Sequence, residues 1–91
     1  MTGVRFYEQF KDEQKRESAG KAVAVYIRKW REGSEEQGRI FKAVVALGKP
    51  PNPPAVFTTI SERYLQKKCR LISEARARQI NPNIFRVLEA R

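Results

Sequence analysis

The sequence predicts an all-α fold, a small bundle of about four to five helices with a proline-rich connector between two helical halves. Residues 1–91 form a single helical domain in this reading, with N-terminal helices in 1–48, the connector in 49–54 and basic C-terminal helices in 55–91. Three observations predict it. Apolar residues recur at helical spacing in the first half, four prolines interrupt the chain once, and only the short stretch 57–60 favours a strand.

The first helical segment is predicted from the spacing of its apolar residues. Val23, Ile27 and Trp30 follow each other at i, i+4 and i+7, which places them on one face of a helix. An apolar cluster also opens the chain, and eight polar residues separate the two. One helix over about 4–31 and two helices that break near 18–20 both fit this pattern.

A second helix is predicted to begin at Ser34. Gly33 ends the preceding segment, and Ser34 with Gln37 has the spacing of a capping box, in which two side chains satisfy free backbone N–H groups. Gly48 is a suitable residue to end this helix. Its apolar face would consist of Ile40, Phe41, Val44, Val45 and Leu47.

Prolines define the connector, residues 49–54, because they remove backbone donors and fix φ. It matches P-x-x-P, although a plain spacer is the simpler interpretation. The next helix begins at Asn52 or at Thr59 and runs to about Gln79. Asn81 and the proline after it predict a break, followed by a short final helix whose core residues are Ile84, Phe85, Val87 and Leu88.

Charge is the main indication of function. The chain has 19 Lys and Arg against 10 Asp and Glu, a net charge of +9 at pH 7. Residues 1–48 carry +3 of this and residues 49–91 carry +6. Such an excess destabilises a compact monomer by self-repulsion unless a polyanion neutralises it. We therefore expect contacts to the phosphates of DNA or RNA, with a basic solubility surface as the alternative.

On the predicted long helix, Arg63, Lys67 and Arg70 would form a row at i, i+4 and i+7 that can follow a phosphate backbone without reading bases. A second basic cluster, Lys21, Arg28, Lys29 and Arg31, accompanies Tyr26 and Trp30. The spacing of these two aromatic residues is more typical of a core than of base stacking. The candidate nucleic-acid-binding residues are Arg63, Lys67, Lys68, Arg70, Arg76, Arg78, Lys21, Arg28 and Lys29.

Composition argues against catalysis. The chain has no histidine and one cysteine, Cys69, so the usual ligands of a protein zinc site and triads with a histidine base are missing. Most carboxylates stand beside Lys or Arg, as in solvated charge pairs. We expect no enzyme activity, no cofactor and no metal. Because no apolar run reaches about 18 residues and the single cysteine suits a reducing compartment, we expect a cytoplasmic protein without a membrane partner.

The chain is small, basic and histidine-free, and it is predicted to be all-helical with a proline hinge. This character, together with the basic row and the closing segment that contains Ser73–Arg76 and Asn81–Phe85, resembles the small helical subunits of CRISPR surveillance complexes of the Cascade type. The resemblance implies a subunit of a ribonucleoprotein assembly for antiviral defence, present in several copies beside other protein subunits. It would stabilise the guide RNA–target duplex or the displaced DNA strand. Two alternatives stay open: a small dimeric DNA-binding transcriptional regulator, and a protein–protein adaptor or inhibitor that binds an acidic surface.

Overall fold

The computed structural model describes residues 2–12 and 14–90, and it is mainly β. Strands contain 47% of the described residues and helices contain 24%, so the prediction of an all-α helical bundle is wrong. The strands are β1 (Val4–Phe10), β2 (Ser18–Glu32), β3 (Arg39–Ala46), β4 (Ala55–Ser61) and β5 (Cys69–Ile72), and the helices are α1 (Glu62–Lys68), α2 (Glu74–Ile80) and α3 (Asn83–Glu89).

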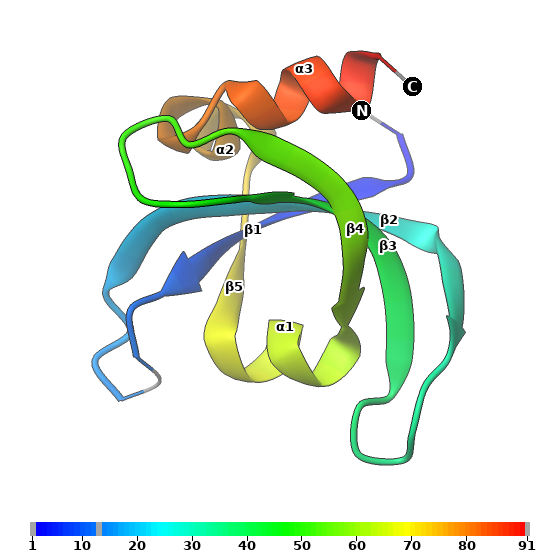
Figure 1. Cartoon of the computed structure of the whole chain (residues 1–91). Coiled ribbons are helices and arrows are strands. Elements are labelled where there is room, and N and C mark those ends of the chain that lie inside the picture. The colour runs from blue at the N-terminus through cyan, green and yellow to red at the C-terminus, as the bar shows by residue number, and fades with distance from the viewer. Residues whose placement is uncertain (1, 13, 91) are drawn as a thin grey trace.

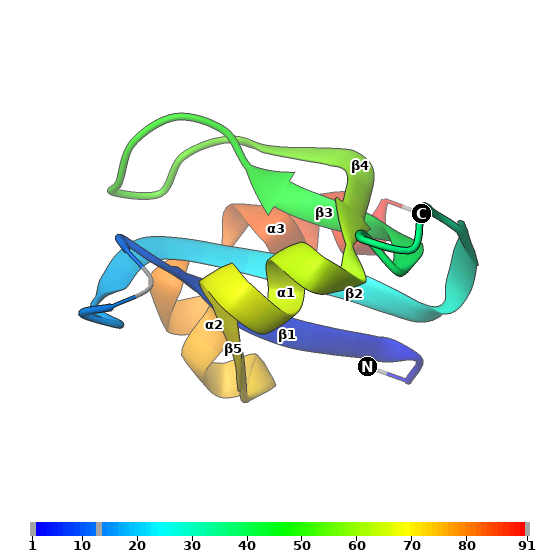
Figure 2. The same cartoon turned by 90° about the horizontal axis from the view of Figure 1, so that it is seen from below.

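The five strands form one antiparallel sheet in the order β4-β3-β2-β1-β5. Strands β1 to β4 follow each other as hairpins, and the chain then returns through α1 so that β5 pairs with the free side of β1. The sheet is strongly curved, with α2 and α3 on one side and α1 on the other (Figure 1). The view from below places α1 in front of the sheet and confirms this arrangement (Figure 2).

Helices on both sides of the sheet explain its two apolar clusters. Neighbouring residues of a strand point to opposite faces, and in β2 both faces are buried over residues 22–25. The cluster towards α2 and α3 contains Phe6, Ala22, Ala24, Val44, Ala77, Ile84, Phe85 and Leu88. The cluster towards α1 contains Val23, Val25, Phe41, Ala43, Ile60, Leu65 and Cys69. The core thus lies on the two faces of a single sheet and not in the interior of a helical bundle.

The predicted helix after Ser34 is instead a turn followed by β3. The Ser34 hydroxyl accepts a hydrogen bond from the Gln37 backbone N–H at 3.2 Å, so the serine half of the predicted capping box exists but closes the β2–β3 hairpin. Gly38 has φ +73°, a conformation that glycine adopts at little cost, and its carbonyl accepts from Gly33 N–H at 2.9 Å. Of the apolar residues expected on a helix face, Ile40, Phe41, Val44 and Val45 are divided between the two faces of β3. Leu47 follows the strand and is exposed.

The predicted long helix over residues 55–79 is also absent, because β4, α1, β5 and α2 occupy this stretch. Ser61 and Ser73 cap the two short helices by accepting from backbone N–H groups of Tyr64 and Arg76. The final helix was predicted correctly. It follows the break at Asn81–Pro82, and its residues Ile84, Phe85 and Leu88 are buried.

The proline-rich segment is the β3–β4 loop and does not separate two helical halves. The peptide bond between Pro50 and Pro51 is cis. The buried Pro53 carbonyl accepts from the side-chain amide of Asn81 at 2.8 Å and from that of Asn83 at 3.3 Å. The loop is therefore attached to the junction between α2 and α3, which fixes these helices on the sheet.

Candidate nucleic-acid interface

The expected basic row does not exist, because its members lie on two different elements. Arg63 and Lys67 are exposed on α1, whereas Arg70 lies on β5 next to its register partner Glu8 on β1. Arg70 donates from Nε to the Glu8 carboxylate and pairs with it through Nη2. Its charge is thus neutralised within the protein, and it cannot continue a phosphate-tracking line.

Glu8 also forms an ion pair with a second arginine from the C-terminal part of the chain. Its side chain is 1% exposed, and Arg76 on α2 approaches its other oxygen at 3.4 Å. Burial raises the pKa of Glu8, but hydrogen bonds from Ser18 and Arg70 and the charges of Arg70 and Arg76 outweigh burial, so that the pKa falls below 4.5. Arg70 and Arg76 therefore stabilise the contact between β1, β5 and α2.

Three further candidates, Arg78, Lys68 and Lys21, are also engaged or partly covered. Arg78 lies 3.9 Å from the centre of the Phe85 ring and 3.6 Å from Glu74. Lys68 and Lys21 are only half-exposed. Among the predicted site residues, Arg63, Lys67, Arg28 and Lys29 are exposed and form no ion pair with a carboxylate of the described residues. Of these four, only Arg28 and Lys29 come together on one surface with aromatic residues.

Arg28 and Lys29 line a hollow of about 320 Å³ near the end of β2. The strand bulges here, since Val25 pairs with Ala43 but Trp30 pairs with Phe41. The hollow is lined by Arg28, Lys29, Trp30, Arg31, Ile40, Lys42 and Thr59. No acidic residue belongs to this lining, and within the described part of the chain none of its four cations forms an ion pair with a carboxylate.

A second hollow of about 380 Å³ shares Lys29 and Lys42 with the first. Its other lining residues are Tyr26, Phe57 and Leu88, and the Lys29 ammonium lies 5.2 Å from the centre of the Tyr26 ring. The two hollows together form what we call the basic–aromatic surface. It consists of Tyr26, Arg28, Lys29, Trp30, Arg31, Arg39, Lys42 and Phe57.

Trp30 is the aromatic residue of this surface that is most accessible to a ligand. It is 42% exposed, although its spacing in the sequence is more typical of a core residue. The Arg39 guanidinium lies 4.4 Å from the centre of its ring, in a cation–π contact. An exposed tryptophan between cations is able to stack on a base while the cations contact phosphates.

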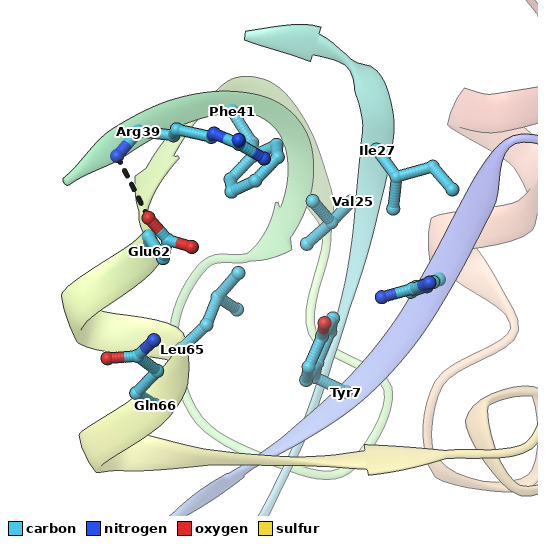
Figure 3. Close-up of a pocket in the computed structure, with 9 residues that line it drawn as sticks. Tyr7, Val25, Ile27, Arg39, Phe41, Glu62, Leu65 and Gln66 are labelled. Atoms are coloured by element: carbon cyan, nitrogen blue, oxygen red, sulfur yellow. Dashed lines mark hydrogen bonds between the residues drawn. The ribbon is translucent and has the colours of Figure 1, made fainter. Parts of the chain in front are cut away.

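A third hollow of about 370 Å³, which we call the α1 pocket, lies between α1 and β1 (Figure 3). Val25, Ile27, Phe41 and Leu65 supply its apolar side chains, and Arg5, Tyr7, Arg39, Glu62 and Gln66 its polar ones. Glu62 Oε1 accepts from the Arg39 backbone N–H at 3.2 Å. Since Arg39 also contacts Trp30, this residue connects the α1 pocket with the basic–aromatic surface.

Sequence reasoning missed Arg39 and Lys42 as site residues, and it placed Arg31 in the second basic cluster without counting it among the candidates. The run Lys29-Trp30-Arg31, an aromatic residue between two cations, was a usable signal for the β2 part. The sequence alone does not place Arg39 and Lys42 of β3 beside these β2 residues, because both belong to a stretch with helical periodicity. Their position follows only from the pairing of β2 with β3.

No protein-family model matches the chain, and neither a curated protein nor a solved structure is significantly similar to it. Residues 2–12 and 14–90 contain no group of three or more side chains placed to hold a metal ion. None of the helices in this part of the chain is long and apolar enough to cross a membrane.

Proposed function

We propose that this protein binds single-stranded nucleic acid through the basic–aromatic surface, without catalysis and largely without regard to sequence. One observation carries the proposal: Trp30 is exposed next to four cations, and no acidic residue lines their hollow. Phosphates would contact Arg28, Lys29, Arg31 and Lys42, and a base would stack on Trp30.

The pairing of the charges supports this surface over the one expected from the sequence. Cations that already neutralise a carboxylate gain little from a phosphate, and Arg70 and Arg76 are in that state. The cations around Trp30 have no such partner among the described residues, so phosphates would relieve their mutual repulsion. Single strands are favoured over duplexes because only unstacked bases expose their faces to an aromatic side chain.

The resemblance to Cascade small subunits implied a helical protein. Because the chain is mainly β, the helical character on which that resemblance depended is absent. Our proposal therefore extends to a nucleic-acid-binding subunit of a larger nucleoprotein assembly and leaves out a role in RNA-guided defence.

The protein contains one tryptophan, so its intrinsic fluorescence reports on this surface directly. A strand of oligo-dT or oligo-U of about 12 nucleotides should quench Trp30 emission and bind more tightly than a duplex of equal length. Fluorescence anisotropy of labelled strands at several salt concentrations gives the affinity and its salt dependence.

The decisive comparison is between two triple variants with the same change in net charge. R28A/K29A/K42A removes cations of the surface and should make the salt slope shallower by about two units for single strands. K15A/R63A/K67A removes exposed cations elsewhere and should leave binding at low salt nearly unchanged. Equal binding by the first variant and the wild type, or equal losses in both variants, would refute the proposal.

A further inference from the structure

We propose that the α1 pocket accepts one guanine base of the bound strand. This inference rests on the proposed function, because it assigns a base site next to a surface that holds the backbone. The pocket has the size of a small-ligand site, about 370 Å³, and combines apolar walls with a few convergent polar groups.

The walls of the pocket suit a flat, partly apolar group. Val25 and Phe41 from the sheet and Leu65 from α1 surround it, and the Tyr7 ring stands on the β1 side (Figure 3). A planar base placed here would bury its faces against these side chains. Its edge would then meet the polar residues of α1.

That edge is read by a carboxylate held in a fixed place. Glu62 Oε1 accepts from the Arg39 backbone N–H at 3.2 Å, and its other oxygen points toward the interior of the pocket (Figure 3). Gly38 allows this approach, because a Cβ at position 38 would lie 2.6 Å from Glu62 Oε1. The carboxylate is thus positioned before any ligand binds.

A fixed carboxylate discriminates between bases by their hydrogen-bond donors. Guanine presents two neighbouring donors, N1–H and the 2-amino group, which pair with a carboxylate. Adenine and cytosine present a ring acceptor at the corresponding position, and this acceptor would face the negative charge of Glu62 without a partner. Gln66, one helical turn after Glu62, lines the same side and offers an acceptor for a further guanine donor.

Charge and connectivity link the pocket to the strand. Arg5 and Arg39 leave the pocket with two cations against one carboxylate, which favours an anionic ligand such as a nucleotide. Arg39 lines the pocket and lies 4.4 Å from the centre of the Trp30 ring. A phosphate at Arg39 would therefore connect a base stacked on Trp30 with a neighbouring base in the pocket.

The test uses oligo-dT strands that contain a single guanine, adenine, cytosine or hypoxanthine, measured by fluorescence anisotropy with the wild-type protein. The guanine strand should bind about tenfold more tightly than the adenine strand. Hypoxanthine lacks the 2-amino group, so its strand should fall between them. Since the wild type alone decides this comparison, no variant needs to fold for the test to be valid.

Glu62→Gln adds a second test. Its amide oxygen still accepts from the Arg39 backbone N–H, but the side chain now offers one acceptor and one donor, a pattern that matches adenine. The preference should move from guanine toward adenine, whereas Glu36→Gln in the β2–β3 turn should keep it. Equal affinities of the wild type for all four strands would overturn the guanine site and leave the proposed function intact. Failure to bind any strand would overturn both.

Discussion

The carboxylate of Glu8 on β1 is bound by the guanidinium of its cross-strand neighbour Arg70 on β5. Glu8 is an inward-facing residue of β1 and would be an isolated buried charge without this contact. Arg76 on α2 completes the arrangement at 3.4 Å. Two of the arginines that make the C-terminal half so basic thus hold the last strand and α2 against the first strand.

Replacing Glu8 by Gln should destabilise the protein. The change leaves Arg70 and Arg76 without a charge partner, but both are about half-exposed and can be solvated, so we expect a loss of about 1–3 kcal/mol. Urea denaturation followed by circular dichroism measures it. Glu17→Gln, at an exposed position, is the control and should change the free energy of unfolding by less than about 0.5 kcal/mol. A loss as small for Glu8→Gln would contradict the structural role of the contact.

The same carboxylate makes stability depend on pH. Its pKa is lower in the folded protein than its ordinary value of 4.5, so in this range the unfolded chain binds more protons than the folded one. The stabilisation is fully present above the unfolded pKa and is lost as the pH falls through the folded pKa. Urea midpoints measured between about pH 6 and about pH 3 should fall less steeply for Glu8→Gln than for the wild type. Parallel curves for the two proteins would rule this contribution out.

The long strand β2 shows why the sequence indicated helices. A strand covered on one face alternates apolar and polar residues, but Ala22 to Val25 are buried on both faces, and this erases the alternation. What remained was the spacing of Val23, Ile27 and Trp30, which also fits a helix. The β-branched and aromatic residues of β2 and β3, taken together, were the better guide to strands.

Local signals were predicted more reliably than their context. Ser34 and the break at Asn81 mark true boundaries, because turns and caps depend on neighbouring residues. Helix α1, however, is capped by Ser61 and does not begin at the predicted Asn52 or Thr59. The candidate site depends on pairing between distant residues. Arg28 and Lys29 were recognised from composition, but only the register of β2 and β3 places Arg39 beside Trp30.

Gly20→Ala should destabilise the protein through the proline-rich loop. Gly20 has φ +70°, and a Cβ there would lie 2.9 Å from Pro50 Cγ, so backbone strain and a steric conflict add up to about 2–3 kcal/mol. Gly3→Ala is the matched control, since φ is +77° and no atom lies within 4 Å of the added Cβ. It should cost only about 1 kcal/mol in urea denaturation. Equal losses would show that the loop does not pack on β2 as described.

Cys69 should be nearly inert in the folded protein. Its side chain is buried in the cluster under α1, and burial raises the pKa of the thiol to about 12. At pH 8 a thiol with this pKa reacts on the order of a thousandfold more slowly than a free cysteine, because only the thiolate attacks. A disulfide reagent followed by absorbance should therefore label the native protein slowly and the urea-unfolded protein at once. Rapid labelling of the native protein would mean that this part of the core opens readily.

Arg39→Lys separates charge from stacking at the basic–aromatic surface. Lysine keeps the positive charge but lacks the planar guanidinium that lies over the Trp30 ring and can itself stack on a base. The salt slope of oligo-dT binding should therefore stay unchanged, while the affinity at fixed salt falls about three- to tenfold. Anisotropy titrations at several salt concentrations measure both quantities. Lys42→Arg, a change between the same residue types at a position that the proposal assigns to phosphate contact alone, should leave slope and affinity close to those of the wild type. If Arg39→Lys also leaves the affinity unchanged, Arg39 acts only as a charge, and stacking beside Trp30 plays no part in binding.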